Sequence, residues 1–265
     1  MMDMLLERIG LPVMPSADLD GLRALHRAYV DPVPYENIAV QLGETRPLDE
    51  AALIERMCAD GRGGYCFEIN TVLAALLRGC GFTVTHHQAV VGGAGPTNHM
   101  ALLVELDGER WLADAGLGEG FIEPLRFQEG ETRLGPFTYG LAREAGGTWW
   151  MGHHEWGTFS GFRMAEEPSA VADFDVYHDR LAHDPESSFV KTLVVQSPQP
   201  DRIVTLRSRT VSVVGPGVKE KRVVEDIVEF AGVLRGTFGI TLVGERLERL
   251  WERATAQHAA FLARA

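Results

Sequence analysis

Residues 62–70 read RGGYCFEIN, with two glycines shortly before a cysteine and an apolar helical stripe after it. The stripe continues at helical spacing to Leu77, so Cys66 is expected in the first turn of an amphipathic helix. Unpaired amides and the helix dipole at that position favour a thiolate over a thiol. Gly63 and Gly64 are expected to allow close approach to a ligand and φ values closed to other residues. The pattern favours a nucleophile over a packing cysteine.

Composition limits the class of protein. The chain has 265 residues, 45% of them hydrophobic and 23% charged, as in ordinary soluble globular proteins. No apolar run is long enough to span a membrane, the first residues lack a signal-peptide pattern, and a net charge of −12 argues against a nucleic-acid partner. The only cysteines, Cys58, Cys66 and Cys80, lack metal-site spacing. These features predict a cytoplasmic enzyme with free thiols, in which Cys58 and Cys80 are core residues.

The first third of the chain has a helical period. Residues 17–80 repeat apolar side chains every three to four positions, with Ser16 placed to cap one helix and Gly61 to end another. This segment is predicted to be helical.

After residue 81 the period becomes two. The pattern predicts a strand over 82–91 and a hairpin over 99–116 that turns at Asp107-Gly108. The middle of the chain is therefore expected to be a barrel or a sandwich. Further strand-like pieces reach residue 196, 197–202 has the composition of a linker, and the tail combines strands over 203–215 with helices over 225–239 and 244–265.

A cysteine nucleophile needs a base, and the base needs a group that orients it. His99 begins the first strand of the predicted hairpin, and Asp114 follows the second strand at a similar distance from the turn. Antiparallel neighbours at that range can touch, which favours a hydrogen-bonded pair over a packing histidine and a turn aspartate. His153 and His154 have no Cys or carboxylate at suitable spacing, so they are expected as exposed polar strand positions and no metal site is predicted.

Six strings in order along nearly the whole chain resemble motifs of the arylamine N-acetyltransferase family. RGGYCFEIN is similar to the family's nucleophile motif and PYENIAV (34–40) to its Pro-aromatic-Glu-Asn motif. The remaining strings are NHMALLVEL (98–106), WLADAGLG (111–118), SSFVKTLVVQ (187–196) and FGITL (238–242).

The resemblance implies an α+β, multidomain fold that agrees with the three segments given by the periodicity. An N-terminal helical bundle (1–84) would carry the nucleophile, and a central antiparallel β-barrel (85–196) would carry the histidine and the aspartate. A C-terminal α/β lid (203–265) would complete the fold.

The resemblance also implies roles for individual residues. Cys66 would be the acyl-accepting nucleophile, His99 its base and Asp114 the residue that orients His99. The family's coenzyme A pocket includes the segment before the histidine, so Gly95 and Thr97 are expected to offer donors to the pyrophosphate. The implied structural support beneath the nucleophile loop consists of Arg62, Glu36 and Asn37.

Two departures from the family pattern affect the donor and the acceptor. Thr97-Asn98 stands where bacterial members often have Arg-Thr, and Leu117 stands where a phenylalanine is usual. Leu117 and Tyr35 are expected to line the substrate site.

The implied activity moves an acyl group, acetyl or somewhat longer, from acyl-CoA through a cysteine thioester to a small aromatic amine. Three alternatives remain open: an amide synthase of natural-product biosynthesis that takes a larger acyl thioester from a carrier protein, a cysteine hydrolase or transglutaminase-like enzyme, and a non-catalytic binding module. The natural amine and the oligomeric state are left open by the sequence.

Overall fold

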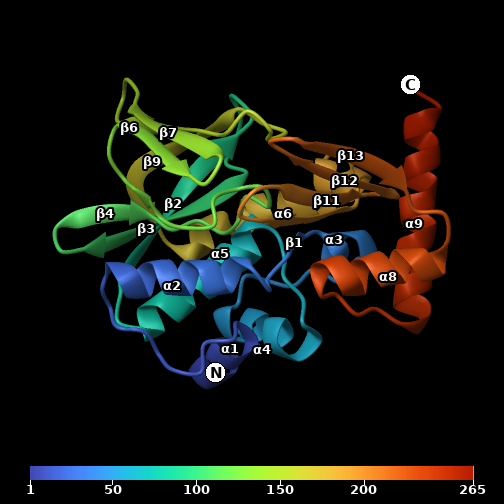
Figure 1. Ribbon diagram of the computed structural model, residues 1–265, viewed down its shortest axis with the longest axis horizontal. Coiled ribbons are helices and arrows are strands. Elements are labelled where there is room, and N and C mark those ends of the chain that lie inside the picture. The colour runs from blue at the N-terminus through green and yellow to red at the C-terminus, as the bar shows by residue number, and fades with distance from the viewer. Residues whose placement is uncertain (265) are drawn as a thin grey trace.

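The computed structural model describes residues 1–264. Helices from the first third of the chain lie beneath a large curved sheet, and a smaller sheet with the last two helices lies beside them (Figure 1). The first segment is helical, as its periodicity predicts, except for the short strand β1 at Tyr35–Glu36. The central helix α5 is buried from Cys66 to Leu77, and α1, α2 and α4 pack around it. These helices are α1 (Met2–Arg8), α2 (Leu19–Val30), α3 (Ile38–Leu42), α4 (Glu50–Asp60) and α5 (Cys66–Gly79).

Helix ends follow local chemistry, with one correction. Gly61 ends α4 in the left-handed conformation (φ 62°), as predicted. The predicted cap at Ser16 is wrong, because Asp18 caps α2 by accepting a 2.8 Å hydrogen bond from the Gly21 amide. The Ser16 hydroxyl instead donates a hydrogen bond to the Asp18 carboxylate. Ser16 therefore supports the capping residue and does not cap the helix itself.

The large sheet is antiparallel and eight-stranded, in the order β5-β4-β3-β2-β9-β8-β7-β6. It curls into a barrel-like layer around its own apolar cluster (Figure 1). The β3–β4 hairpin turns at Asp107 (φ 51°) and Gly108 (φ 78°), as predicted, since two positive φ values in a row suit Asp-Gly. The strands are β2 (Thr83–Val91), β3 (His99–Leu106), β4 (Glu109–Leu112), β5 (Leu125–Arg126), β6 (Gly130–Leu134), β7 (Phe137–Arg143), β8 (Thr148–Gly152) and β9 (Gly161–Ser169).

The smaller sheet has the order β1-β10-β11-β12-β13 and packs against α8 and α9 around a third apolar cluster. Residues 197–202 do not link two domains, because they close the hairpin between β10 and β11. The elements of this part are β1 (Tyr35–Glu36), β10 (Val194–Pro198), β11 (Ile203–Arg207), β12 (Thr210–Gly215), β13 (Val218–Val223), α8 (Ile227–Phe238) and α9 (Gly244–Leu262).

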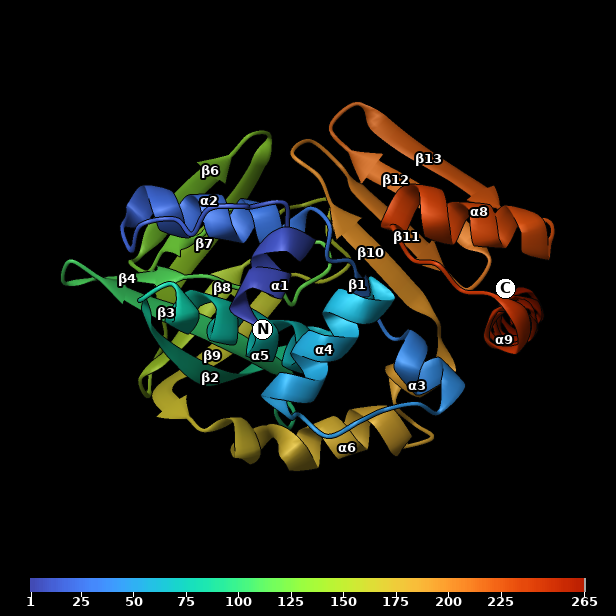
Figure 2. The ribbon, with the colours of Figure 1, turned by 90° about the horizontal axis from the view of Figure 1, so that it is seen from below.

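The segment between the two sheets is helical, contrary to the strands predicted there. Its elements are the 3-10 helix η1 (Val171–Phe174), α6 (Asp175–His183) and α7 (Ser188–Lys191), seen along the lower edge of Figure 2. Phe174 and Leu181 join the apolar cluster of the N-terminal helices. Burial of these side chains against α5 therefore decides the conformation, which short-range periodicity could not reveal.

His153 and His154 also differ from expectation. They follow β8 in a loop rather than occupying exposed strand positions, and His154 is only 4% exposed. Their rings stack on Phe159 at 4.5 Å and Phe137 at 4.4 Å between centroids. Burial lowers the pKa of both rings, that of His153 to about 3 with a further contribution from His154. Both are therefore neutral aromatic packing residues.

A mixed α and β fold with a barrel-like sheet is confirmed, whereas the boundaries 1–84, 85–196 and 203–265 remain predictions. β1 and β10 pair across those limits in the smaller sheet. Within residues 1–264, no helix is both long and apolar enough to cross a membrane.

Candidate active site

Cys66 is the first residue of α5, directly after the N-cap Tyr65. Glu68 closes the first turn by accepting a 3.2 Å hydrogen bond from the Tyr65 amide. The two glycines before Cys66 permit close packing within the protein rather than positive φ. A Cβ on Gly63 would lie 1.8 Å from the Pro34 carbonyl oxygen, and one on Gly64 would lie 2.5 Å from a Glu68 carboxylate oxygen. These glycines therefore fix the nucleophile loop against its support.

His99 and Asp114 form the buried pair that the hairpin predicts. His99 Nε2 lies 2.6 Å from Asp114 Oδ2, and the two side chains are 2% and 0% exposed. Burial opposes a charge on the imidazole, but Asp114 and the adjacent Cys66 outweigh it and raise the pKa of His99 to about 10. Asp114 occupies Nε2, so Nδ1 is the ring nitrogen that could exchange a proton with the adjacent Cys66, whose thiol donates to the Asn98 carbonyl at 3.5 Å.

Asn70 completes this arrangement and escaped the sequence analysis. It lies one turn after Cys66 on α5 and donates to Asp114 Oδ1 at 2.7 Å and to the Met100 carbonyl at 2.6 Å. Its own Oδ1 accepts from the Ala115 amide at 3.1 Å. The signal in the sequence was an asparagine within an apolar helical stripe, one turn after Cys66, and the structure buries its side chain fully.

Gly116 lies in the loop that follows β4 and packs directly against Cys66, so a side chain would not fit at this position. A Cβ at this position would lie 2.8 Å from Cys66 Cα and 2.8 Å from Asn70 Nδ2. The Gly116 amide donates to Asp114 Oδ1 at 2.8 Å, so Asp114 is held by Asn70 and the loop as well as by His99.

The predicted support residues lie beneath the nucleophile loop. Arg62 and Glu36 form a bidentate pair at 2.7 and 2.9 Å, both about 2% exposed or less. Arg56, missed from the sequence, pairs with Glu68 at 2.8 Å and donates to the Gly63 carbonyl at 2.9 Å.

Asn37 has a different structural role from the Arg62–Glu36 pair. It donates to the carbonyls of Phe189 and Thr192 and accepts from the Val194 amide at 2.9 Å. It therefore joins the segment between the two sheets to the nucleophile side of the molecule.

A cavity of about 300 Å³ opens onto Cys66 and His99. Tyr35 and Leu117, both predicted near the substrate, line it. Its other walls include Asn37, Val91, Asn98, Gly116, Glu119, Thr158, Phe159, Leu181, Ser188, Phe189, Val194, Gln196 and Arg207.

Gly95 and Thr97 are not in the walls of this cavity. Gly95 is exposed on the loop that leads to His99, and the Thr97 hydroxyl donates to Gln88 at 2.8 Å. Asn98 fastens the base of that loop through two hydrogen bonds with the Val91 backbone.

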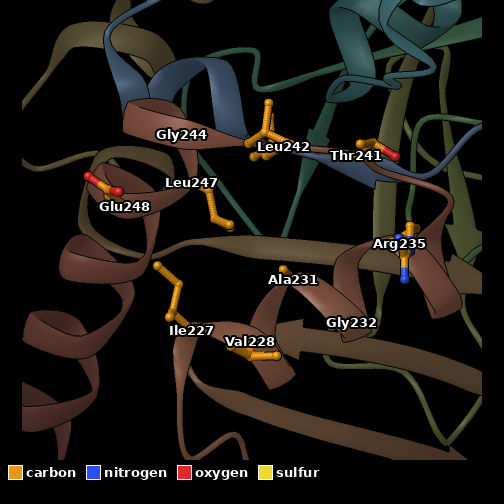
Figure 3. A pocket seen from close by; sticks show the side chains of 11 residues that line it. Ile227, Val228, Ala231, Gly232, Arg235, Thr241, Leu242, Gly244, Leu247 and Glu248 are labelled. Carbon is orange, nitrogen blue, oxygen red and sulfur yellow. The ribbon is translucent and has the colours of Figure 1, made fainter.

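A second cavity, of about 380 Å³, lies between α8 and the start of α9 (Figure 3). Its walls are mainly apolar, with the polar ends of Arg235 and Glu248 on opposite sides. None of its lining residues borders the Cys66 cavity. Within residues 1–264, no cluster of three His, Cys, Asp or Glu side chains could hold a metal ion.

The geometry predicts selective alkylation of one thiol. Iodoacetamide at about pH 6.5 should label Cys66 much faster than Cys58 or Cys80, because the attacking species is a thiolate. Burial raises the pKa of both Cys58 and Cys80, and neither borders the cavity. Peptide mass spectrometry over a time course measures the three rates. Equal labelling of all three would contradict the assignment of Cys66.

Known proteins resemble this chain over most of its length. The N-acetyltransferase family model matches residues 18–247. The arylamine N-acetyltransferase / N-hydroxyarylamine O-acetyltransferase of Salmonella typhimurium is 32% identical over 202 residues, which cover 73% of this chain and 69% of the relative. Proansamycin X synthase of Amycolatopsis mediterranei is 33% identical over 129 residues, covering 45% of this chain and 50% of the relative.

A solved structure shares the fold. The Mycobacterium marinum arylamine N-acetyltransferase in complex with CoA superposes with a TM-score of 0.87 at 25% identity, covering 96% of this chain and 98% of that chain. The matched family model, the relatives and the shared fold agree. The chain therefore belongs to the arylamine N-acetyltransferase family of enzymes.

Proposed function

We propose that this enzyme transfers an acyl group from acyl-CoA to an aromatic amine through a thioester on Cys66. The observation that carries the proposal is the thiol at the start of α5 beside the buried His99–Asp114 pair, on a cavity large enough for a small arylamine. Cys66 is the nucleophile, His99 moves the proton, and Asp114 orients and stabilises the imidazolium.

In the first half-reaction, the Cys66 thiolate attacks the thioester carbonyl carbon and forms a new carbon–sulfur bond. Amides in the first turn of α5 stabilise the oxyanion. Collapse of the intermediate breaks the bond to the CoA sulfur, and His99 gives its proton to that leaving thiolate. The products are acyl-Cys66, neutral His99 and free CoA.

In the second half-reaction, an amine attacks the acyl-Cys66 carbonyl. His99 accepts the amine proton, the bond to Cys66 sulfur breaks, and the thiolate–imidazolium pair returns. An aromatic amine suits this step because it is neutral near pH 7, whereas an alkylamine is mostly protonated. This chemistry makes the amide without a metal ion.

The coenzyme part of the proposal is supported by the M. marinum relative, whose structure contains CoA. Gly95 and Thr97 remain the proposed contacts for the pyrophosphate. Since the Thr97 hydroxyl proton already goes to Gln88, the loop would use its backbone amides, of which the exposed Gly95 is the most accessible.

Intact-protein mass spectrometry tests the function. Mixed with acetyl-CoA, the protein should gain one acetyl group on Cys66 and lose it when aniline is added, with acetanilide as product. A protein that never gains the acetyl group contradicts the proposal. Faster loss to water than to the amine would identify a hydrolase instead.

A second candidate is an amide synthase that joins a larger acyl chain to an aryl amine. The similarity to proansamycin X synthase favours it, although that match covers only half of the relative. Long acyl thioesters, on CoA and on an acyl carrier protein, distinguish the two: the synthase should be acylated by them faster than by acetyl-CoA.

Leu117 is predicted to set the acyl length. Its side chain is 6% exposed, packs in the barrel cluster and borders the Cys66 cavity. Leucine in place of the usual phenylalanine leaves apolar volume, and filling it with one or two methylenes should gain about 1–2 kcal/mol, or around tenfold in specificity. The Leu117→Phe variant should therefore shift preference from propionyl and hexanoyl towards acetyl. Specificity constants for the three acyl-CoA donors measure this shift. The same ratio of constants in the wild type and the variant would show that Leu117 does not line the acyl site.

A further inference from the structure

The Cys66 cavity contains a buried carboxyl that the proposed reaction does not use. Glu119 is 2% exposed, and its Oε1 accepts two hydrogen bonds from Thr158, one from the amide at 2.9 Å and one from the hydroxyl at 2.5 Å. Its Oε2 forms no hydrogen bond with residues 1–264 and is not sealed in the interior. One carboxyl oxygen is therefore held by Thr158, while the other has no partner among residues 1–264, on a side chain that lines the cavity.

The loop before Glu119 packs tightly against Cys66 and Tyr35. Gly116 packs on Cys66, and a Cβ on Gly118 (φ 67°) would lie 2.8 Å from Cγ of the Tyr35 ring. These contacts hold the loop between the reacting sulfur and the carboxyl. Glu119 is thereby placed in the cavity wall at a fixed position relative to Cys66.

No cation neutralises this carboxyl directly. Arg207 borders the same cavity, yet among residues 1–264 no basic side chain lies within the 4.0 Å salt-bridge distance of Glu119. Burial raises the pKa of Glu119, against the opposing effects of the Thr158 hydrogen bonds and the more distant Arg207. A buried carboxyl with a free oxygen is stabilised by a ligand that donates a hydrogen bond to it.

We propose that Glu119 selects acceptor arylamines that carry a hydroxyl or second amino group at the end of the ring away from the reacting amine. The ring lies between the apolar walls formed by Leu117, Phe159 and Phe189, with its amine towards Cys66. The distal donor then reaches Glu119 Oε2, and a distal carboxylate is repelled. This inference rests on the proposed function and names its acceptor class.

Three acceptors test the selection with acetyl-CoA as donor: para-aminophenol, para-methoxyaniline and para-aminobenzoate. The first two have similar amines, but the methoxy group cannot donate a hydrogen bond. The wild-type enzyme should prefer para-aminophenol to para-methoxyaniline by about tenfold or more in kcat/KM, the scale of leaving a buried hydrogen-bonding group without its partner. It should use para-aminobenzoate poorly.

Glu119→Gln provides the sharpest variant. Thr158 supplies two donors, so the amide oxygen must face Thr158 and the amide nitrogen must face the cavity. The cavity wall then presents an amide N–H donor in place of the carboxyl oxygen acceptor of the wild type. The preference for para-aminophenol should be lost, and para-aminobenzoate should gain about tenfold relative to it, with the melting temperature unchanged because the Thr158 contacts remain.

Glu123→Gln is the matched control, since Glu123 binds Arg27 and does not border the cavity. It should leave the acceptor ratios unchanged. Acetylation of Cys66 by acetyl-CoA, measured by mass in the absence of amine, separates the two proposals. If Cys66 is not acetylated, the proposed function is wrong. If it is acetylated but the acceptor ratio is near one in the wild type, or the same in Glu119→Gln, the role of Glu119 is wrong.

Discussion

Asp114→Asn should lower turnover by about 10³-fold or more while the protein remains folded. Oδ1 of Asp114 accepts from Asn70 and Gly116, so the oxygen of an introduced amide would stay there. The amide nitrogen would then face His99 Nε2 and donate to it. This forces the proton of a neutral His99 onto Nδ1, which can no longer accept a proton at the side of Cys66.

Single-turnover acetylation followed by mass spectrometry measures the loss, and circular dichroism checks the fold. Asp107→Asn is the control, because Asn also tolerates the positive φ of that turn and the residue is remote from the reaction. An Asp114→Asn enzyme that keeps more than half of its activity would show that another residue orients His99.

The same variant should change the pH dependence of stability. The pKa of His99 is raised from 6.5 to about 10, so the protonated pair stabilises the fold fully below pH 6.5 and the contribution is lost as pH rises through about 10. Asp114→Asn removes the carboxylate that raises this pKa. Urea unfolding at several pH values in this window should therefore show a smaller decline for the variant than for the wild type.

Arg62→Leu should lower the free energy of unfolding by about 3–5 kcal/mol, because it leaves a buried carboxylate without its partner. Glu36 is 1% exposed, and among residues 1–264 it otherwise accepts only from the Ile38 amide, at 2.6 Å. Burial alone would raise the pKa of Glu36, but Arg62 holds it below the ordinary value. The wild-type pair thus contributes stability above the ordinary Glu pKa, and this contribution is lost as pH falls through the lowered pKa.

Urea unfolding near neutral pH measures the loss. Arg78→Leu is the control, because Arg78 and Glu50 form an ion pair with both side chains more than a third exposed. Arg78→Leu should lower the free energy of unfolding by less than about 1 kcal/mol. Similar losses in the two variants would mean that the buried Arg62–Glu36 pair contributes no more to stability than an exposed ion pair.

The sequence predicts features whose causes are local. The start of α5 at Cys66, the end of α4 at Gly61 and the Asp107-Gly108 turn follow from apolar periodicity and from residues that adopt special φ values. The His99–Asp114 contact was also within reach, because the hairpin that joins them is closed by that local turn. Six motif strings in order were enough to identify the family.

Contacts between distant segments were not predictable in this way. Asn70 reaches Asp114 across 44 residues, and Thr158 binds Glu119 across 39, so no local pattern indicates either contact. The conformation of 171–191 is set by burial against α5, which outweighs local strand preference. His154 became buried because Phe137, from strand β7, stacks on its ring.

By itself, the sequence indicated the class of chemistry, since a thiol at a helix start and a histidine–aspartate hairpin depend on short stretches of chain. Only the tertiary structure decided which side chains share the cavity with Cys66. The cavity is built from the loop that follows β4 and contains Asp114, the β8–β9 loop, the α6–α7 segment and the smaller sheet. These segments are brought together only by packing. Specificity therefore depends on three-dimensional contacts such as Glu119 with Thr158, because a carboxyl acquires its role from the groups that surround it after folding.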